Sequence, residues 1–376
     1  MPSLLDPLKN IFAREHSSRV VGIDIGESSI KIVELGRSDE KAVLHNYGEI
    51  ALGPRAGSSV GQATNLSPEK VAEALRDLVR ETGVTVRHVV FTIPFKASLL
   101  SLVELPDVSS REMQTMIPLE ARKYIPVPIT DVSLDWWVLP KRKITSVAPS
   151  SESKGISVPL GKVEVIIAAI SKETFGRHET IKKEAHFVNV PSHMEIEIFS
   201  TLRAIVGRDL DPILVVDIGA GMTKLIIVEE GVVRGSHIAS SGGQDITLAL
   251  SRSLNISFEQ AEEKKCRVGV AGDEEGRDVL AAGELVISNI MNEAARFTEN
   301  YERRHEIKIK KVIFVGGGAR LKGLTDIAEK NFGGSSIVVG NPFTRIDTPA
   351  FLSAMLREIG PNFAVAIGAA LKGLEE

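Results

Sequence analysis

Along the first part of the chain, stretches with the spacing of hydrophobic residues typical of strands alternate with a stretch that has helical spacing. Apolar runs rich in β-branched residues predict strands at 20–35, 41–52 and 87–93. Between them, residues 67–82 carry apolar positions at helical spacing, and Ser67 stands where a helix cap is expected. The order strand, strand, helix, strand predicts a sheet covered by helices, which is an α/β fold.

The second half repeats this layout. Further strands are predicted at 213–217, 223–229 and 231–238, and helices at 244–252, 257–265, 277–304 and 362–372. The last of these helices contains Gly368, which costs stability unless another element packs closely on it, so we expect a close helix–helix contact there. Residues 94–185 form a separate insert in this reading, with a polar loop at 141–160.

Composition narrows the class of protein. A chain of 376 residues is long enough for two or more domains, and its net charge of −4 gives no reason to expect nucleic acid as a partner. Cys266 is the only cysteine, which fits a reducing compartment. The sequence shows no secretory signal and no run of 18 apolar residues, so we expect a cytoplasmic protein.

One short pattern occurs in both halves. Asp24 ends the first predicted strand and Asp217 ends its counterpart, each within an Asp-Ile-Gly, and Lys31 and Lys224 follow seven places later. An apolar strand, a turn of small or polar residues and a second strand predict a β-hairpin. One copy alone would be an ordinary strand end, but two copies with the same lysine offset indicate a duplicated element.

The composition of these hairpins points to phosphate chemistry. Glycines let backbone N–H groups approach an anion closely, and a carboxylate at a strand end is a ligand that Mg²⁺ accepts, directly or through water. Two facing hairpins would clamp one nucleotide between related lobes. The candidate phosphate-binding residues are Gly26, Ser28, Ser29 and Lys31 in the first hairpin and Gly219, Gly221, Met222, Thr223 and Lys224 in the second.

A third element follows a late strand. The apolar run 311–315 leads directly into Gly316, Gly317 and Gly318 and then into a helical segment at 321–332. Such a turn lets a flat base or a sugar lie against bare backbone. It lacks the glycine spacing of a dinucleotide fingerprint and the Walker A motif, so Rossmann and P-loop folds are disfavoured.

Together these elements resemble the actin-like ATPase superfamily. Within it the chain is similar to the PilM family of type IV pilus assembly, with the FtsA family of cell division as a relative. The most specific likeness lies in the insert, at Glu104-Leu105-Pro106, at the run 120–126 and at Leu134-Asp135, a pattern typical of the extra subdomain that both families carry.

The resemblance implies an actin-like (ribonuclease H-like) duplicated fold with two lobes around a nucleotide cleft and a small inserted α+β subdomain. The boundaries it implies are an extension at 1–17, a first lobe at 18–93 and 186–210, the insert at 94–185, a second lobe at 211–243 and 312–376, and a subdomain of that lobe at 244–311.

The resemblance also assigns site residues and cofactors. It implies ATP with Mg²⁺, the metal facing Asp24 and Asp217, and Glu195 as an acidic residue near the metal, with Glu197 as its competitor. Glu262 and Lys265, three apart on one helix face, would reach the ribose and base. Gly316, Gly317 and Gly318 match the adenosine turn, where Arg320 could stack on adenine.

Whether the protein is an enzyme stays open at this stage, because Asp24, Asp217 and Glu195 include no assured catalytic base for ATP hydrolysis. We expect slow ATPase activity or binding alone. The alternatives are an FtsA-like division protein, which would normally carry a C-terminal membrane helix, a small-molecule kinase, for which no sugar-pocket aspartate is evident, and a scaffold of a secretion system.

The family's partner is the short cytoplasmic N-terminal tail of the inner-membrane protein PilN, held in a groove between the first lobe and the extra subdomain. The resemblance therefore implies a PilN-like peptide as partner, contacts with other pilus assembly proteins, and a place at the inner face of the membrane through partners. Trp136 and Trp137 are neighbours in a predicted strand and so point to opposite faces, one towards a core and one available to an interface.

Overall fold

The computed structural model describes residues 19–39, 41–85, 87–140, 161–271 and 274–375. Two segments predicted from the sequence, the extension at 1–17 and the polar loop at 141–160, lie outside the described residues. The chain divides into two compact units, Met1–Pro94 with Glu179–Glu376, and Phe95–His178. The second unit corresponds to the insert, which the sequence placed at 94–185. No helix in the described ranges combines the length and the apolar character needed to cross a lipid bilayer.

The first sheet of the larger unit is built from β1 (Val20–Ile25), β2 (Ser29–Ser38), β3 (Lys41–Ala51), β4 (Val89–Ile93) and β8 (Ser192–Ile196). Their order across the sheet is β3-β2-β1-β4-β8. β2 runs antiparallel to both β1 and β3, whereas β1, β4 and β8 are parallel. Strand β8 was not predicted, because its run of five residues mixes polar and apolar side chains.

The second sheet repeats this plan with β9 (Ile213–Ile218), β10 (Thr223–Glu229), β11 (Val232–Ala239), β12 (Lys311–Val315) and β13 (Ser336–Val339). Its order is β11-β10-β9-β12-β13, with an antiparallel hairpin followed by parallel strands. The two sheets therefore have equivalent strands at equivalent positions, which confirms the duplication that the repeated hairpin predicted. We call the parts built around these two sheets the first and the second lobe.

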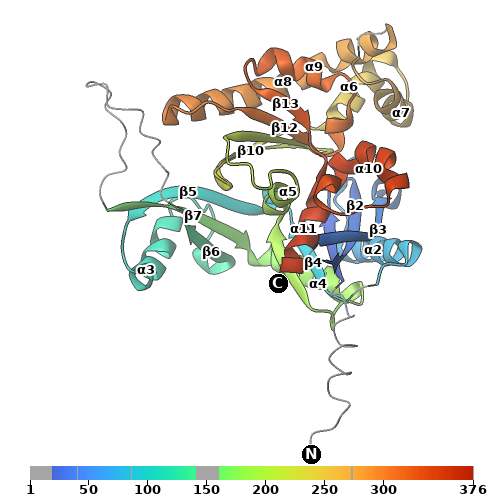
Figure 1. Cartoon of the computed structure of the whole chain (residues 1–376). Coiled ribbons are helices and arrows are strands. Elements are labelled where there is room, and N and C mark those ends of the chain that lie inside the picture. Colours follow the sequence, from blue (N-terminus) through green and yellow to red (C-terminus); the bar gives the residue numbers. More distant parts are fainter. Residues whose placement is uncertain (1–18, 40, 86, 141–160, 272–273, 376) are drawn as a thin grey trace, which may run out of the picture. The chain divides into compact units, whose positions relative to one another are not determined.

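Helices pack on both sheets of the larger unit (Figure 1). They are α2 (Pro68–Thr82), α4 (Lys172–Glu184), α5 (Glu197–Ile205), α6 (Gly243–Leu254), α7 (Phe258–Val268), α8 (Glu274–His305), α9 (Leu324–Asn331), α10 (Ser353–Ile359) and α11 (Ala364–Glu375). The helices predicted from periodicity occur close to their predicted bounds. The short α10 was not predicted, since seven residues give too little periodicity.

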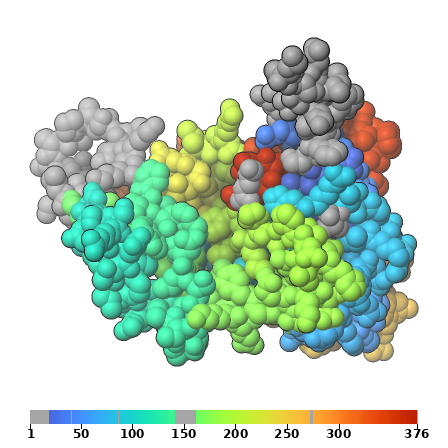
Figure 2. All heavy atoms as spheres, turned by 90° about the horizontal axis from the view of Figure 1, so that it is seen from below, coloured from blue at the N-terminus to red at the C-terminus, as the bar shows by residue number. Residues whose placement is uncertain are grey.

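Each sheet buries its own apolar core. In the first lobe, Leu75 of α2 and Phe91 of β4 share one cluster with Ile181 of α4. In Figure 2 the lime part of the chain, which includes α4, lies beside the blue residues of this lobe. In the second lobe, the long helix α8 contributes Ile287 and Met291 to a separate cluster.

The C-terminal helix α11 packs on the first sheet and on α5, where Figure 1 shows it alongside β4. A Cβ on Gly368 would lie 1.7 Å from the carbonyl oxygen of Ser200 in α5. A Cβ on Gly22 in β1 would lie 2.0 Å from the carbonyl oxygen of Ala366. The close helix–helix contact expected at Gly368 is therefore present. The sequence placed 312–376 wholly in the second lobe, but this helix buries its small residues against the first.

The smaller unit contains β5 (Ser98–Pro106), α3 (Ser110–Ala121), β6 (Val132–Val138) and β7 (Lys162–Ser171), with β7 between β5 and β6. Helix α3 starts with a capping box made by Ser109 and Glu112. Met113 and Ile117 of α3 pack on one face of the sheet, and Trp136 packs against the same cluster, whereas Trp137 stays 44% exposed.

We predict that Gly368→Ala destabilises the protein. The added methyl group would meet backbone that belongs to another helix, and overpacking of this kind costs about 1–3 kcal/mol. Urea unfolding monitored by circular dichroism measures the change.

The matched control is Gly176→Ala in α4. Among the described residues, no heavy atom outside its own stretch of helix lies within 4 Å of its Cβ position, so alanine should raise helix stability slightly. Equal effects of the two substitutions would show that Gly368 is not packed as the structure places it.

Candidate functional site

The two repeated hairpins have the same register. Asp24 of β1 lies opposite Lys31 of β2, and Asp217 of β9 lies opposite Lys224 of β10. Both turns also close in the same way. The Gly26 N–H donates to the Ser29 carbonyl at 3.0 Å, and the N–H of Gly219 donates to the carbonyl of Met222 at 2.9 Å. The pattern in the sequence thus corresponds to one local structure built twice.

Lys224 joins the second hairpin to α5. Its Nζ lies 2.8 Å from Oδ2 of Asp217 and 2.8 Å from Oε2 of Glu197, and all these side chains are buried. Burial by itself would lower the pKa of Lys224, but the charges and hydrogen bonds of Asp217 and Glu197 outweigh it and raise the pKa above its usual range. The lysine is therefore a fixed positive charge between two carboxylates.

Asp24 brings the first hairpin into the same charge cluster. Burial raises the pKa of Asp24 to about 6, against the attraction of Lys31, and the charges of Glu197, Lys224 and Asp217 also act on it. Groups of both hairpins and of α5 are therefore close enough to influence one another. This set has three carboxylates, those of Asp24, Glu197 and Asp217, and two ammonium groups, those of Lys31 and Lys224. The excess negative charge favours an additional cation.

The acidic residue of α5 in this cluster is Glu197, not Glu195. Glu195 of β8 accepts two hydrogen bonds from Arg203, at 2.6 and 2.7 Å, and one from Ser200 at 2.5 Å. Its carboxylate is therefore engaged in fixing α5. Strand β8 ends at Ile196, and Glu197 opens the helix, which turns its side chain towards Lys224. The preference for Glu195 in the sequence analysis is corrected accordingly.

The second turn is braced by the start of α6. The N–H of Gly243 donates to the carbonyl of Gly219 at 2.8 Å, and the N–H of Gln244 to that of Ala220 at 2.9 Å. These bonds fix the turn while leaving the Gly221 N–H to another acceptor. That acceptor is Oε2 of Glu27, which lies 3.2 Å away in the first hairpin's turn. A backbone amide of this turn therefore already holds an anionic oxygen.

The glycine turn after β12 lies against the second hairpin. Gly316 has a φ of +80°, and a Cβ there would come 2.4 Å from Oδ1 of Asp217. Only glycine fits this position without strain. Close by, Oδ1 of Asn362 is buried without a hydrogen-bond partner among the described residues, and it would lie 3.6 Å from a Cβ on Gly317. Asn362 was not predicted as a site residue, because only the fold places it beside this turn.

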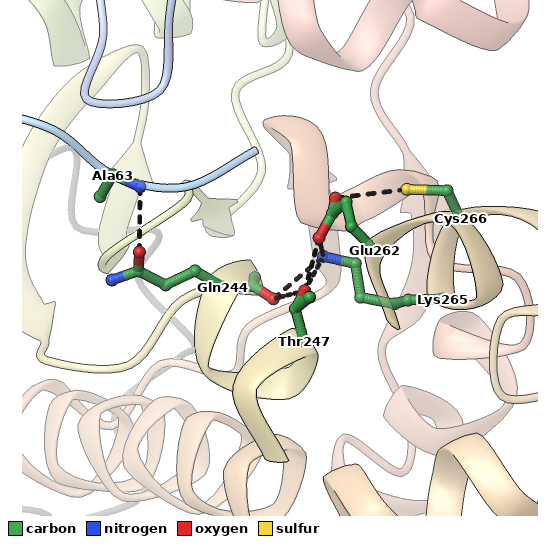
Figure 3. Close-up of polar contacts among 7 residues, drawn as sticks. Ala63, Gln244, Thr247, Glu262, Lys265 and Cys266 are labelled. Atoms are coloured by element: carbon green, nitrogen blue, oxygen red, sulfur yellow. Dashed lines mark hydrogen bonds and ion pairs between the residues drawn. The ribbon is translucent and has the colours of Figure 1, made fainter. Parts of the chain in front are cut away.

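Glu262 and Lys265 share one face of α7 as their spacing predicted (Figure 3). Nζ of Lys265 donates to Oε2 of Glu262 at 2.7 Å, to the hydroxyl of Thr247 at 2.8 Å and to the carbonyl of Gly243 at 3.0 Å. Cys266 donates from Sγ to Oε1 of Glu262 at 3.4 Å. The pair is thus oriented by α6 and fixed beside the braced turn.

The other predicted site residues take varied positions. Nζ of Lys31 donates to the hydroxyl of Ser29 at 2.7 Å and lies 3.4 Å from Glu49. The hydroxyl of Thr223 donates to the carbonyl of Ser241. Arg320 faces Glu358 at 3.4 Å, and its charge also reaches Cys266, so it lies on the side of the site where α7 is.

Asp24 and Asp217 carry carboxylate oxygens, which are the ligand type that Mg²⁺ accepts. Within the described ranges, no group of three histidine, cysteine or acidic side chains is close enough to hold a metal ion. Mg²⁺ commonly binds through one or two carboxylates, several waters and substrate phosphates. Asp24 and Asp217, in a cluster with excess negative charge, match that donor set.

The pKa of Asp24 gives a testable pH dependence. The folded protein keeps this proton up to about pH 6, whereas the unfolded chain releases it near 3.8. The folded state therefore binds more protons between these values, and stability falls as pH rises through the window. Asp24→Asn removes this loss, so its free energy of unfolding should rise relative to the natural protein by about 1–3 kcal/mol from about pH 4 to about pH 7.

Urea unfolding at several pH values, without nucleotide or metal, measures this difference. Asp77→Asn is a control of opposite sign, because a hydrogen bond from Arg55 lowers the pKa of Asp77. The stabilisation that Asp77 contributes is present above the pKa that this residue has in the unfolded chain, and it is lost on acidification. A pH-independent difference for Asp24→Asn would contradict the buried cluster.

Comparisons with known proteins agree with this architecture. The family model described as type IV pilus assembly protein PilM matches residues 22–374. A solved PilM–PilN type IV pilus biogenesis complex contains a chain that is 28% identical, with a TM-score of 0.76, over 95% of this chain and 99% of that one. The cell division protein FtsA of Enterococcus hirae is 22% identical over 92% of this chain and 86% of its own length.

A further structure shows the fold alone. The ethanolamine utilization protein EutJ from Carboxydothermus hydrogenoformans has a TM-score of 0.53 at 16% identity, over 98% of this chain and 96% of its own. The duplicated sheets thus form the actin-like fold that the sequence predicted. The match over nearly the whole chain decides between the families considered: this chain belongs to the PilM family of type IV pilus assembly proteins.

Proposed function

We propose that this protein binds ATP with Mg²⁺ between its two hairpins, as a component of type IV pilus assembly. The observation that carries the proposal is the buried cluster in which Asp24 and Asp217, from equivalent positions of the two lobes, share the neighbours Lys224 and Glu197. A phosphate chain with its metal supplies both the cation and the anionic oxygens that such an arrangement of carboxylates, lysines and turn amides can bind.

The proposed roles follow the structure. The turns at Gly26–Ser29 and Gly219–Met222 would hold the phosphates through backbone N–H groups, with Lys31 and Lys224 adding positive charge. Asp24 and Asp217 would hold Mg²⁺, directly or through water. When bound, the metal neutralises phosphate charge.

The adenosine end of the nucleotide would lie between α7 and the glycine turn. Glu262 and Lys265 are already oriented together by Thr247, and carboxylate and ammonium groups suit the hydroxyls of a ribose. Gly316 and Gly318 lie against Ile218, so Gly317 would offer bare backbone to the base, and Arg320 would offer a planar guanidinium.

We infer that ATP acts chiefly as a ligand that favours one arrangement of the lobes, with slow hydrolysis at most. Hydrolysis needs a group that orients an attacking water. Glu197 is tied to Lys224, and Glu195 to Arg203, which leaves neither carboxylate well suited to that task. A ligand that binds one arrangement more tightly shifts the population towards it.

We predict that Asp217→Asn weakens Mg²⁺-dependent ATP binding by about tenfold or more, because it removes one charge from the metal-facing pair. Isothermal titration with and without Mg²⁺ measures the effect. Asp211→Asn removes the same charge from an exposed site of the same lobe and should bind normally. Unchanged affinity in a folded Asp217→Asn protein would remove the basis of the proposed site.

Cys266 adds a readout that needs no substitution. It is the only thiol and lies on the helix that carries Glu262 and Lys265. Bound nucleotide should slow its alkylation by covering that face of α7.

We further propose that the protein binds the cytoplasmic tail of a PilN-like membrane protein, which would place it at the inner face of the membrane. The related complex contains a PilN chain, which supports this choice of partner. In the smaller unit, the sheet face opposite α3 carries a row formed by Leu102, Ile166 and Trp137 on adjacent strands. Ile166 is buried, so Trp137 is the exposed end of this row, and exposed aromatic residues are enriched at protein interfaces.

We predict that Trp137→Ala lowers the affinity for a synthetic PilN-tail peptide by about tenfold, as loss of an interface aromatic commonly does. Fluorescence anisotropy of the labelled peptide measures binding. Leu119→Ala is the control, because this exposed leucine lies on α3 and not on the opposite sheet face. The proposed surface would be wrong if both variants bound like the natural protein, and the proposed partner would be wrong if none bound.

A further inference from the structure

Glu27 is a carboxylate within the turn of the first phosphate-type hairpin. Its Oε2 accepts a hydrogen bond from the N–H of Gly221, in the turn of the second hairpin, at 3.2 Å. A Cβ on Gly221 would lie 2.7 Å from the same oxygen, so the contact depends on glycine at this position. The two turns that we propose to hold phosphates are thus joined by an anion that belongs to the chain itself.

The backbone around Glu27 is fixed by neighbouring contacts. The carbonyl of Glu27 accepts from the N–H of Thr64 at 2.9 Å and from the hydroxyl of Thr64 at 3.0 Å. Next to Thr64, the N–H of Ala63 donates to Oε1 of Gln244 in α6 at 3.0 Å (Figure 3). The first lobe therefore has a second contact with the second lobe beside Glu27, and the backbone that carries the Glu27 carboxylate is held near Gly221.

The Glu27 carboxylate occupies a turn that can also bind the negative charge of a phosphate. A glycine turn with inward N–H groups attracts anions, and a carboxylate oxygen meets that requirement as a phosphate oxygen does. The same carboxylate would repel the phosphates of a nucleotide bound between the turns, because like charges at contact distance in a partly buried site are weakly screened.

Resting on the proposed function, we propose that the Glu27 carboxylate occupies the anion cradle of the second hairpin when nucleotide is absent and that phosphate displaces it. Glu27 thereby determines how tightly phosphorylated nucleotides bind. The effect belongs to the phosphate groups, so a nucleoside without phosphate does not feel it. Release of Glu27 also breaks its hydrogen bond with Gly221, which is one of the contacts between the two lobes. Phosphate binding is therefore coupled to the loss of this contact.

The test compares Glu27→Gln with the natural protein in titrations of ATP, ADP and adenosine at constant Mg²⁺ and salt. Glutamine keeps the size and an acceptor oxygen but removes the charge. ATP and ADP should bind about three- to tenfold more tightly to the variant, the change expected when one nearby like charge is removed from a partly buried site. Adenosine should bind equally to both proteins.

Glu81→Gln is the matched control, since it removes the same charge from a side chain that is 74% exposed on α2. Its affinities should equal those of the natural protein. Weaker ATP binding by Glu27→Gln would overturn the proposal, because it would make Glu27 a ligand of the metal or nucleotide. Equal gains for adenosine would also overturn it, because they would report a general change in lobe contact. If the natural protein and both variants fail to bind ATP, the proposed function itself fails.

Discussion

The structure depends on one buried ammonium group. Lys224 lies between Asp217 of its own hairpin and Glu197 of α5, at 2.8 Å from each, and its charge reaches Asp24 of the other hairpin. A buried carboxylate is costly without a compensating charge, so removal of this lysine would take away the ammonium group that both Asp217 and Glu197 contact. The two hairpins have equal register, so each places an aspartate near the end of its central strand opposite a lysine.

Glycines then determine how closely the surrounding elements approach that cluster. Gly316 lets the turn after β12 touch Asp217, Gly221 lets Glu27 reach a backbone amide, and Gly368 lets α11 lie on α5, which carries Glu197. Each contact would be prevented by a single added carbon. The site is therefore positioned by close approaches that glycines allow, one of them between the lobes, and its side chains bring the charge.

Much of this was predictable from the sequence, and the remainder was not, for physical reasons. The hairpins and their Asp–Lys pairs are local, so a repeated motif with a constant offset sufficed to predict both. The choice of Glu197 over Glu195 depends on where a short strand ends and a helix begins, which periodicity does not resolve. The contact of Glu27 with Gly221 and the packing of α11 on the first sheet join distant segments, and no local pattern encodes them.

The most direct test of the account is a crystal structure of the protein with Mg²⁺ and a non-hydrolysable ATP analogue. The account predicts one nucleotide with its phosphates between the two turns, the metal facing Asp24 and Asp217, and the adenosine beside Lys265 and Gly317. A nucleotide bound elsewhere, with both hairpins unchanged and the contact between Glu27 and Gly221 intact, would contradict it.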